Sequence, residues 1–289
     1  MTAPHALRTE SLVAGYGRTP IVDGVSIDVP MHRVSVIVGA NACGKSTLLK
    51  AMSRLIPAMS GAVILDGKSL DQLPTKDLAR TLGLLPQQPV APEGIAVADL
   101  VGRGRHPHQR LFRSWTSEDD RAVTEALAAT GVLDLADRAV DELSGGQRQR
   151  VWIAMALAQE TDILLLDEPT TFLDVSHQIE VLDLLTDLNI RRGTTIVMVL
   201  HDINLAARYA DHLFALRAGR LVASGAPRDV VTSDLVREVF DLDATVIDDP
   251  VSGTPLVLPR GRHRVLTAAE SAAAVAAHTV PASTTGEIR

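Results

Sequence analysis

Two apolar runs in the second half of the chain predict the strands of a parallel sheet. Residues 163–166 (ILLL) and 194–200 (TTIVMVL) are apolar along nearly their whole length. Strands covered by helices on both faces show this pattern, whereas strands with one face in water alternate apolar and polar residues. Between the two runs, apolar residues recur at the spacing of one helix face: Val175, Ile179, Leu182, Leu185 and Leu188. This order indicates an α/β fold with a mostly parallel sheet.

The first third of the chain predicts a further strand and helix joined by a glycine loop. Residues 34–38 (VSVIV) form a β-branched run, and Lys45–Met52 has a helical pattern. We expect antiparallel strands at 12–14 and 25–29, which would form an N-terminal β-subdomain. Further strands are predicted at 62–65, which precedes an Asp-Gly hairpin turn, at 82–85, and as a pair within 213–225.

The middle and the end of the chain predict helices. Between residues 89 and 160 the pattern is helical, with Ser117 and Asp120 at the start of a helix to 129 and a second helix over 147–159. We therefore expect one domain over 1–265 with this helical subdomain inserted. Residues 266–289 form an Ala-rich tail, where Thr267 and Glu270 could cap a short helix and 283–289 are expected to be disordered.

Charge and composition narrow the function classes. The chain has 28 Lys+Arg against 35 Asp+Glu, a formal net charge of −7. Because nucleic-acid binding usually leaves a basic footprint, we expect no nucleic-acid partner. The single cysteine, Cys43, excludes an internal disulfide and fits a reducing compartment. The sequence shows no run of about 18 strongly apolar residues and no secretory signal. We therefore expect a cytoplasmic location.

The segment Gly39 to Ser46 (GANACGKS) fits the P-loop pattern between the predicted strand and helix. Its glycines let backbone N–H groups surround a phosphate chain, and the helix N-terminus adds a favourable dipole. Lys45, one of only four lysines, would reach the β- and γ-phosphates, and the Ser46 hydroxyl would bind Mg²⁺. A glycine-rich turn with a surface lysine is the alternative. The predicted nucleotide-binding residues here are Gly39, Asn41, Cys43, Gly44, Lys45, Ser46 and Thr47.

Two carboxylates follow the apolar run at 163–166. Asp167 ends this predicted strand, where it would bind Mg²⁺ directly or through water. Glu168 would act as general base on an attacking water. Solvated acids at a strand end are the alternative for this pair alone, and the P-loop makes that alternative much weaker.

A second glycine-containing turn precedes the predicted helix at 147–159. The sequence LSGGQ covers 143–147, and its helix N-terminus is a second potential anion site. It is too far along the chain to belong to the first loop. Taken alone, the turn could equally be an ordinary helix cap. Its candidate nucleotide-binding residues are Ser144, Gly145, Gly146 and Gln147.

Taken together, these motifs resemble the nucleotide-binding domain of an ABC transporter over about residues 8–260. The resemblance also covers Tyr16, Gln87, the segment 171–174 (TFLD) and His201, in that family's order. It implies that Tyr16 stacks on adenine, and that Gln87 approaches Mg²⁺ and the attacking water. It also implies that His201 contacts the γ-phosphate. Considered alone, Tyr16 and His201 would more often be packing residues.

The family arrangement implied by this resemblance is a head-to-tail dimer. The LSGGQ turn of one copy would close on ATP held by the P-loop of the other, and Asp174 would cross to the opposite site. Separate partners would be two transmembrane permease subunits, contacted through the region of Gln87, and indirectly a substrate-binding protein. The sequence departs from the common pattern at Ala42, where many relatives have glycine, and at Thr171-Phe172, which replaces Ser-Ala.

Other segments are similar to importer ATPases for ferric siderophores, haem and cobalamin. These are the cationic run 102–113 (GRGRHPHQRLFR), the segment 115–119 (WTSED), the segment 249–258 (DPVSGTPLVL) and the segment 170–174 (TTFLD), and the last two resemble the siderophore branch. On charge alone the cationic run would be a solvated loop. We expect an ATP-hydrolysing subunit of a ferric-siderophore importer at the cytoplasmic face of the membrane. The alternatives are cobalamin or haem import, a soluble ABC ATPase acting on nucleic acid or the ribosome, and a non-hydrolysing scaffold.

Overall fold

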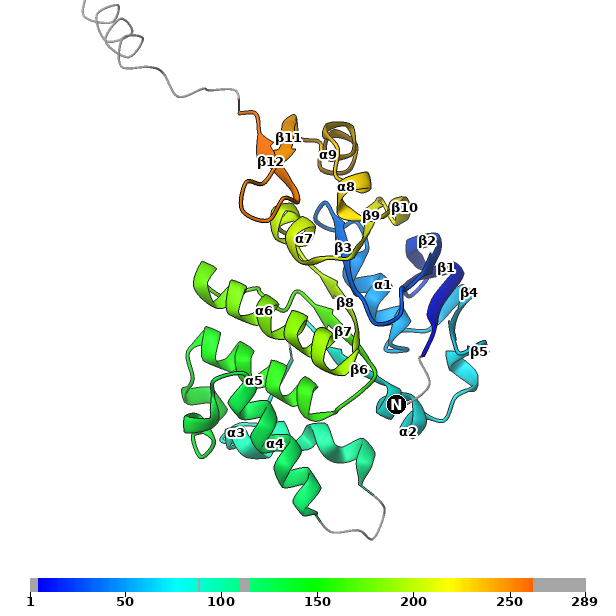
Figure 1. The fold of residues 1–289 in the computed structure, drawn as a ribbon. Helices are drawn as coiled ribbons and strands as arrows, with labels where there is room; N and C mark the ends of the chain where they lie inside the picture. Colours follow the sequence, from blue (N-terminus) through cyan, green and yellow to red (C-terminus); the bar gives the residue numbers. More distant parts are fainter. Residues whose placement is uncertain (1–4, 88, 110–114, 262–289) are drawn as a thin grey trace, which may run out of the picture.

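The computed structural model describes residues 5–87, 89–109 and 115–261. Within these residues the chain forms a central six-stranded sheet, a four-stranded antiparallel sheet and a two-stranded C-terminal hairpin (Figure 1). The predicted cap at Thr267 and the tail from 266 to 289 lie outside the described residues. No helix in the described part of the chain is long and apolar enough to cross a bilayer.

The central sheet has the strand order β10-β9-β3-β8-β7-β6 and is parallel except for β10. Strands β3, β7 and β8 are buried along their whole length, as their continuous apolar runs predict. The strands are β3 (Val34–Gly39), β6 (Leu82–Leu85), β7 (Ile163–Asp167), β8 (Thr195–Val199), β9 (His212–Arg217) and β10 (Arg220–Gly225).

The two faces of this sheet pack against different layers. Ile37, Leu165 and Val197 point to the face covered by helix α1 (Lys45–Met52) and the antiparallel sheet. Val36 and Leu164 point to the opposite face, against the remaining helices. The antiparallel sheet has the order β2-β1-β4-β5, with β1 (Leu7–Tyr16), β2 (Thr19–Asp28), β4 (Ala58–Leu65) and β5 (Lys68–Ser69). The predicted antiparallel pair and the Asp-Gly hairpin are both confirmed.

Helices α3, α4 and α5 lie between β6 and β7 in sequence and pack together in the green lower part of Figure 1. These helices therefore lie, in sequence, between two neighbouring strands of the central sheet. The helices are α2 (Thr75–Thr81), α3 (Val97–Gly102), α4 (Ser117–Ala129), α5 (Gly145–Ala158), α6 (Val175–Arg192), α7 (Ile203–Tyr209), α8 (Pro227–Val230) and α9 (Ser233–Phe240).

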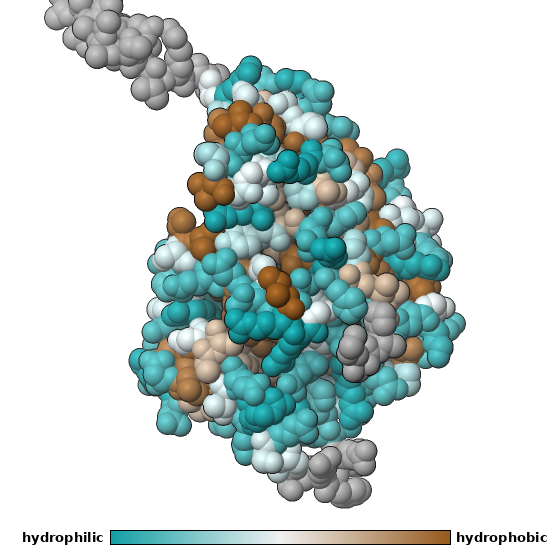
Figure 2. Space-filling model, viewed as in Figure 1, coloured by the Kyte–Doolittle hydropathy of each residue, from teal (hydrophilic) through white to brown (hydrophobic). Residues whose placement is uncertain are grey.

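The C-terminal hairpin is a feature that the apolar pattern did not predict. Strands β11 (Ala244–Asp248) and β12 (Pro255–Pro259) pair with each other and with no other described strand. The face shown in Figure 2 is largely hydrophilic, with brown apolar surface at its upper end, where Figure 1 places this hairpin. Ile247, Val251 and Leu258 are the exposed large apolar residues of the hairpin and its loop.

The predicted cap of α4 is wrong by one residue. Thr116, not Ser117, precedes the helix, and its hydroxyl accepts a bond from the Asp119 N–H. Asp119 Oδ2 in turn accepts from the Thr116 N–H at 3.1 Å. The sequence offers two overlapping pairs at this spacing. The structure uses the earlier one because Asp119 is buried against Arg105.

The described part of the cationic run, residues 102–109, is not a solvated loop, and residues 110–113 of the run lie outside the described residues. Its 3₁₀ segment Arg103–His108 buries Arg105, whose side chain is only 3% exposed. The Arg105 guanidinium donates to Asp119 Oδ1 at 3.0 Å, to the Ala158 carbonyl at 2.8 Å and to Glu160 Oε2 at 2.8 Å. Burial alone would raise the pKa of Asp119, but hydrogen bonds from Arg105 and Thr116 outweigh it and lower that pKa. Arg105 therefore joins α4 to the end of α5.

Replacing Arg105 with alanine is expected to lower the free energy of unfolding by about 3–5 kcal/mol, because Asp119 would remain buried without its cation. Arg103→Ala is the matched control, since Arg103 is an exposed cation of the same run. It should change stability by less than about 0.5 kcal/mol. Urea unfolding followed by circular dichroism measures both values. Equal stabilities of the two variants would contradict this account of Arg105.

Candidate functional site

The loop between β3 and α1 requires glycine at two positions. Gly39 has φ 155°, and a Cβ there would lie 2.3 Å from the Leu216 carbonyl oxygen. Gly44 caps α1 with φ 103°, a conformation that other residues rarely adopt. Ala42 also has a left-handed backbone, with φ 60°. The departure from glycine at Ala42 therefore leaves the loop conformation possible, at a cost of about 1–2 kcal/mol.

Lys45 lies inside this loop. Its side chain is buried, and the ammonium group donates to the carbonyls of Gly39 at 2.9 Å and Ala40 at 3.0 Å. The thiol of Cys43 is buried beside Gly39, and burial raises its pKa. The sulfur is therefore kept neutral, and the positive charge of Lys45 dominates the loop.

Ser46 and Asp167 meet beside the loop. The Ser46 hydroxyl donates to Asp167 Oδ1 at 2.8 Å. Asp167 Oδ2 is buried and has no hydrogen-bond partner among the described residues. Burial raises the pKa of Asp167, although the Ser46 bond opposes this. A hydroxyl beside a buried carboxylate with one unused oxygen is a donor set that fits Mg²⁺, which binds few protein oxygens and completes its shell with water and phosphate.

Three side chains converge on Glu168, the residue after β7. Gln87 Nε2 donates to Glu168 Oε2 at 2.8 Å, and the Thr171 hydroxyl donates to the same oxygen at 3.1 Å. His201 Nε2 lies 2.6 Å from Glu168 Oε1. Glu168 itself has a left-handed backbone, with φ 56°, a strain that is common at functional sites.

This convergence follows from the sheet topology. Gln87, Glu168 and His201 each follow the C-terminal end of a strand, and those strands, β6, β7 and β8, are adjacent and parallel. The hydrogen bond from Thr171 to Glu168 was not predicted from the sequence. There, Thr171 was noted only because Thr171-Phe172 replaces the common Ser-Ala. The pattern of apolar residues does not predict that the turn after Glu168 brings Thr171 back to it.

A cavity of about 520 Å³ brings most of the predicted residues together. Asp167 and Gly39 lie beside this cavity through their contacts with Ser46 and Lys45. Tyr16 lies in the wall of this cavity and is half exposed. Ile21 is a wall residue that the sequence did not indicate. The other predicted residues in the wall are Asn41, Cys43, Gly44, Lys45, Ser46, Thr47, Gln87, Glu168 and His201.

The second glycine turn and Asp174 do not line this cavity. Ser144 and Gln147 form a capping box at the start of α5, with reciprocal bonds of 3.3 and 3.1 Å. Asp174 caps α6 by accepting from the His177 N–H at 3.0 Å, and this bond lowers the pKa of Asp174. Gly145 and Gly146 occupy the first turn of α5. Within one chain, the predicted residues therefore form two separate groups.

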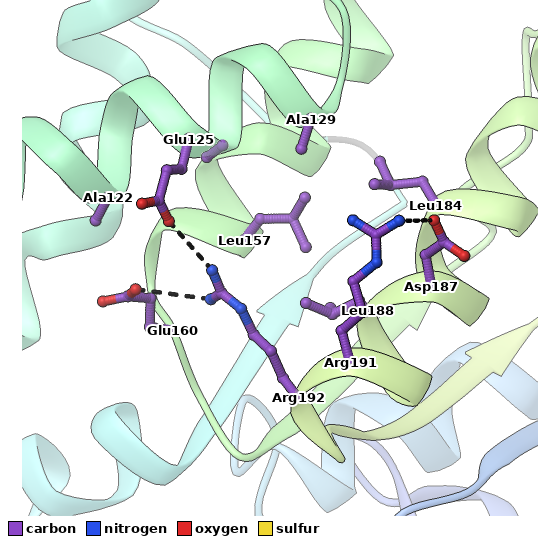
Figure 3. A pocket seen from close by; sticks show the side chains of 11 residues that line it. Ala122, Glu125, Ala129, Leu157, Glu160, Leu184, Asp187, Leu188, Arg191 and Arg192 are labelled. Carbon is purple, nitrogen blue, oxygen red and sulfur yellow. Dashed lines mark hydrogen bonds and ion pairs between the residues drawn. The ribbon is translucent and has the colours of Figure 1, made fainter.

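A different cavity, of about 320 Å³, lies between α4, the end of α5 and α6 (Figure 3). Arg192 on α6 spans it, with ion pairs to Glu125 at 3.3 Å and to Glu160 at 3.6 Å. Leu157, Leu184 and Leu188 supply apolar wall. None of the predicted site residues lines this second cavity. The candidate phosphate-binding residues instead line the cavity of about 520 Å³ described above, which we call the P-loop cavity.

Comparison with known proteins agrees with the geometry. The family described as ABC transporter matches residues 22–171. A probable siderophore transport system ATP-binding protein of Bacillus subtilis is 54% identical over 261 residues, which cover 90% of this chain and 95% of that protein. The ferric enterobactin transport ATP-binding protein of Escherichia coli is 53% identical over 256 residues, covering 89% and 94%.

A solved structure shows the same fold. The structure of a dimeric bacterial ABC transporter cassette superposes with a TM-score of 0.68 at 27% identity, covering 76% of this chain and 98% of that chain. With the P-loop cavity, the LSGGQ helix cap and relatives above 50% identity over most of their length, the chain belongs to the ABC transporter family.

Proposed function

We propose that this chain is the ATP-hydrolysing subunit of an importer that takes up ferric siderophores through separate permease subunits. The observation that carries the enzymatic part is Glu168, held by three side chains at the edge of the P-loop cavity. The relatives described above support the cargo, because two of them are named for siderophore or ferric enterobactin transport.

In this proposal ATP binds with its phosphates on the P-loop. Lys45 exchanges its carbonyl partners for the β- and γ-phosphates, and the N–H groups of the loop and of α1 donate to the phosphate oxygens. Tyr16 stacks on the adenine through its exposed ring face. Ser46, Asp167 and Gln87 would hold Mg²⁺, which would supply positive charge that offsets the negative charge of the phosphates.

Glu168 is the general base of the proposed hydrolysis. It accepts a proton from a water that attacks the γ-phosphorus, while the bond to the bridging oxygen of ADP breaks. Gln87 and Thr171 fix one oxygen of Glu168 by hydrogen bonds. His201 pairs with the other oxygen, and in this proposal it contacts the γ-phosphate.

The two separate groups of predicted residues support a head-to-tail dimer. Ser144, Gly145, Gly146 and Gln147 begin a helix whose N-terminus favours anions, yet they do not reach the P-loop cavity of their own chain. In the proposed dimer they close on ATP held by a second copy, and Asp174 reaches the opposite site. The dimeric cassette with this fold supports association of two copies.

We place the subunit at the cytoplasmic face of the membrane, attached to two permease subunits and served by a substrate-binding protein. The test is co-purification from native membranes followed by measurement of phosphate release with binding proteins loaded with different cargoes. Stimulation by a ferric-siderophore-loaded protein is expected. Stimulation only by a cobalamin- or haem-loaded protein would contradict the cargo. Phosphate release that no permease partner affects would favour a soluble ATPase of the same family.

A further inference from the structure

The C-terminal hairpin is attached to the helix that follows His201. A two-stranded sheet is marginal by itself, so β11 and β12 depend on the surface beneath them. Ala244 and Val257 are buried in the same core as Ala206 and Ala207 of α7. The hairpin, residues 244–259, contains the segment 249–258. The proposed hydrolysis mechanism gives this hairpin no role.

One side-chain amide joins the hairpin to α7. Asn204 Oδ1 accepts from the Val257 N–H at 2.7 Å, and Asn204 Nδ2 donates to the Val257 carbonyl at 3.2 Å. The amide therefore pairs with both backbone groups of one residue, as a neighbouring strand would. This arrangement fixes the first turn of α7 against the edge of β12.

The same turn lies close to His201 in the chain. Asp202 caps α7 by accepting from the N–H groups of Asn204 at 2.7 Å and Leu205 at 3.0 Å. His201 is the residue directly before this cap. Any displacement of the first turn of α7 is therefore transmitted through one peptide unit to His201.

The far end of α7 is also held. The Tyr209 hydroxyl donates to Asp183 Oδ1 on α6 at 2.8 Å. Burial and the bond to Asp183 raise the pKa of Tyr209 to about 12, so this hydroxyl remains a donor near neutral pH. Polar contacts therefore lie at both ends of α7, with those of Asn204 at the end nearer the site.

His201 needs such support because burial does not fix it. Its side chain is 47% exposed, and among the described residues its polar contact is with Glu168 Oε1, at 2.6 Å. We propose that Asn204 is a positioning residue, which anchors α7 to the C-terminal hairpin and so holds His201 at Glu168. This inference rests on the role proposed above for His201 in hydrolysis.

A double-mutant cycle on the full chain assembled with its permease subunits tests the inference. Asn204→Ala is expected to lower kcat for ATP about 10-fold, with KM changed less than about 2-fold. In a protein that already carries His201→Ala, adding Asn204→Ala should lower kcat by less than a further 2-fold or so, because the imidazole that Asn204 positions is absent. Arg260→Ala removes a bond to Thr245 within the hairpin without touching α7, and should leave kcat within about 2-fold.

Equal kcat losses from Asn204→Ala in both backgrounds would overturn the inference, because they would show an effect independent of His201. An unchanged kcat in the single variant would also overturn it. If Asn204→Ala does not fold, Asn204→Asp retains the acceptor for Val257, removes the donor, and should give the same non-additive loss. Normal hydrolysis by His201→Ala would instead reject the proposed role of His201, and this inference with it. An impaired His201→Ala beside a normal Asn204→Ala would reject only the inference.

Discussion

Replacing Glu168 with glutamine is expected to lower ATP hydrolysis about 10³-fold while ATP binding persists. Glutamine has nearly the same shape, and its amide can still contact Gln87, Thr171 and His201, the groups around Glu168. It cannot accept the proton of the attacking water. The change also removes a negative charge that faces the γ-phosphate, so bound ATP and the closed dimer should persist. Phosphate release and nucleotide retention on the purified complex measure the two effects.

Glu180→Gln is the matched control, because Glu180 is an exposed carboxylate on α6 outside the P-loop cavity. Its hydrolysis should equal that of the unsubstituted protein within about 2-fold. Normal turnover by the Glu168 variant would show that another group takes the proton. If the Glu168 variant lost both ATP binding and hydrolysis, Glu168 would be needed for the structure of the binding site, and its role as the base would not be supported.

Replacing Lys45 with alanine is expected to weaken ATP binding at least about 100-fold, since a buried charge that pairs with phosphate is lost. The ammonium group lies within the loop at the Gly39 and Ala40 carbonyls, where a phosphate chain would be bound. Lys45→Arg should also bind poorly, because a planar guanidinium does not fit a space shaped for a compact ammonium. Titration with a fluorescent ATP analogue measures the affinity.

Lys68→Ala removes an exposed lysine of β5 and serves as the control for net charge. Its affinity for the analogue should remain within about 2-fold. Circular dichroism spectra of all variants establish that the fold is retained. Affinity of Lys45→Ala within about 3-fold of the unsubstituted protein would contradict the P-loop assignment, because that assignment requires a charge-assisted contact at this position.

Local patterns were sufficient to predict the centre of the fold. Strands β6 and β7 and helix α1 lie within one residue of the predicted ranges, because uniform apolar runs and a glycine loop are local signals. Strand β1 is longer than predicted. Its exposed residues, such as Glu10 and Ser11, interrupt the apolar pattern. The hairpin of β11 and β12 was missed because its stability comes from packing on α7 rather than from its own sequence.

The candidate site was predictable to the extent that each contact follows from a motif. Lys45 and Glu168 are in short patterns with a chemical reason for each residue. The contacts of Thr171 with Glu168 and of Arg105 with Asp119 depend on tertiary packing, which composition and spacing do not encode. For this reason the interpretation of the cationic run as a solvated loop was wrong over its described residues, 102–109. Counting charges does not reveal which cation the fold buries.

The central claim is that ATP hydrolysis at Glu168 drives ferric-siderophore uptake. The most direct measurement is accumulation of a siderophore carrying radiolabelled iron in sealed vesicles that contain the permease, with binding protein on one side and ATP with this subunit on the other. The proposal predicts ATP-dependent accumulation with the unsubstituted chain and none above background with Glu168→Gln. Equal accumulation with both chains, or accumulation of cobalamin alone, would contradict it.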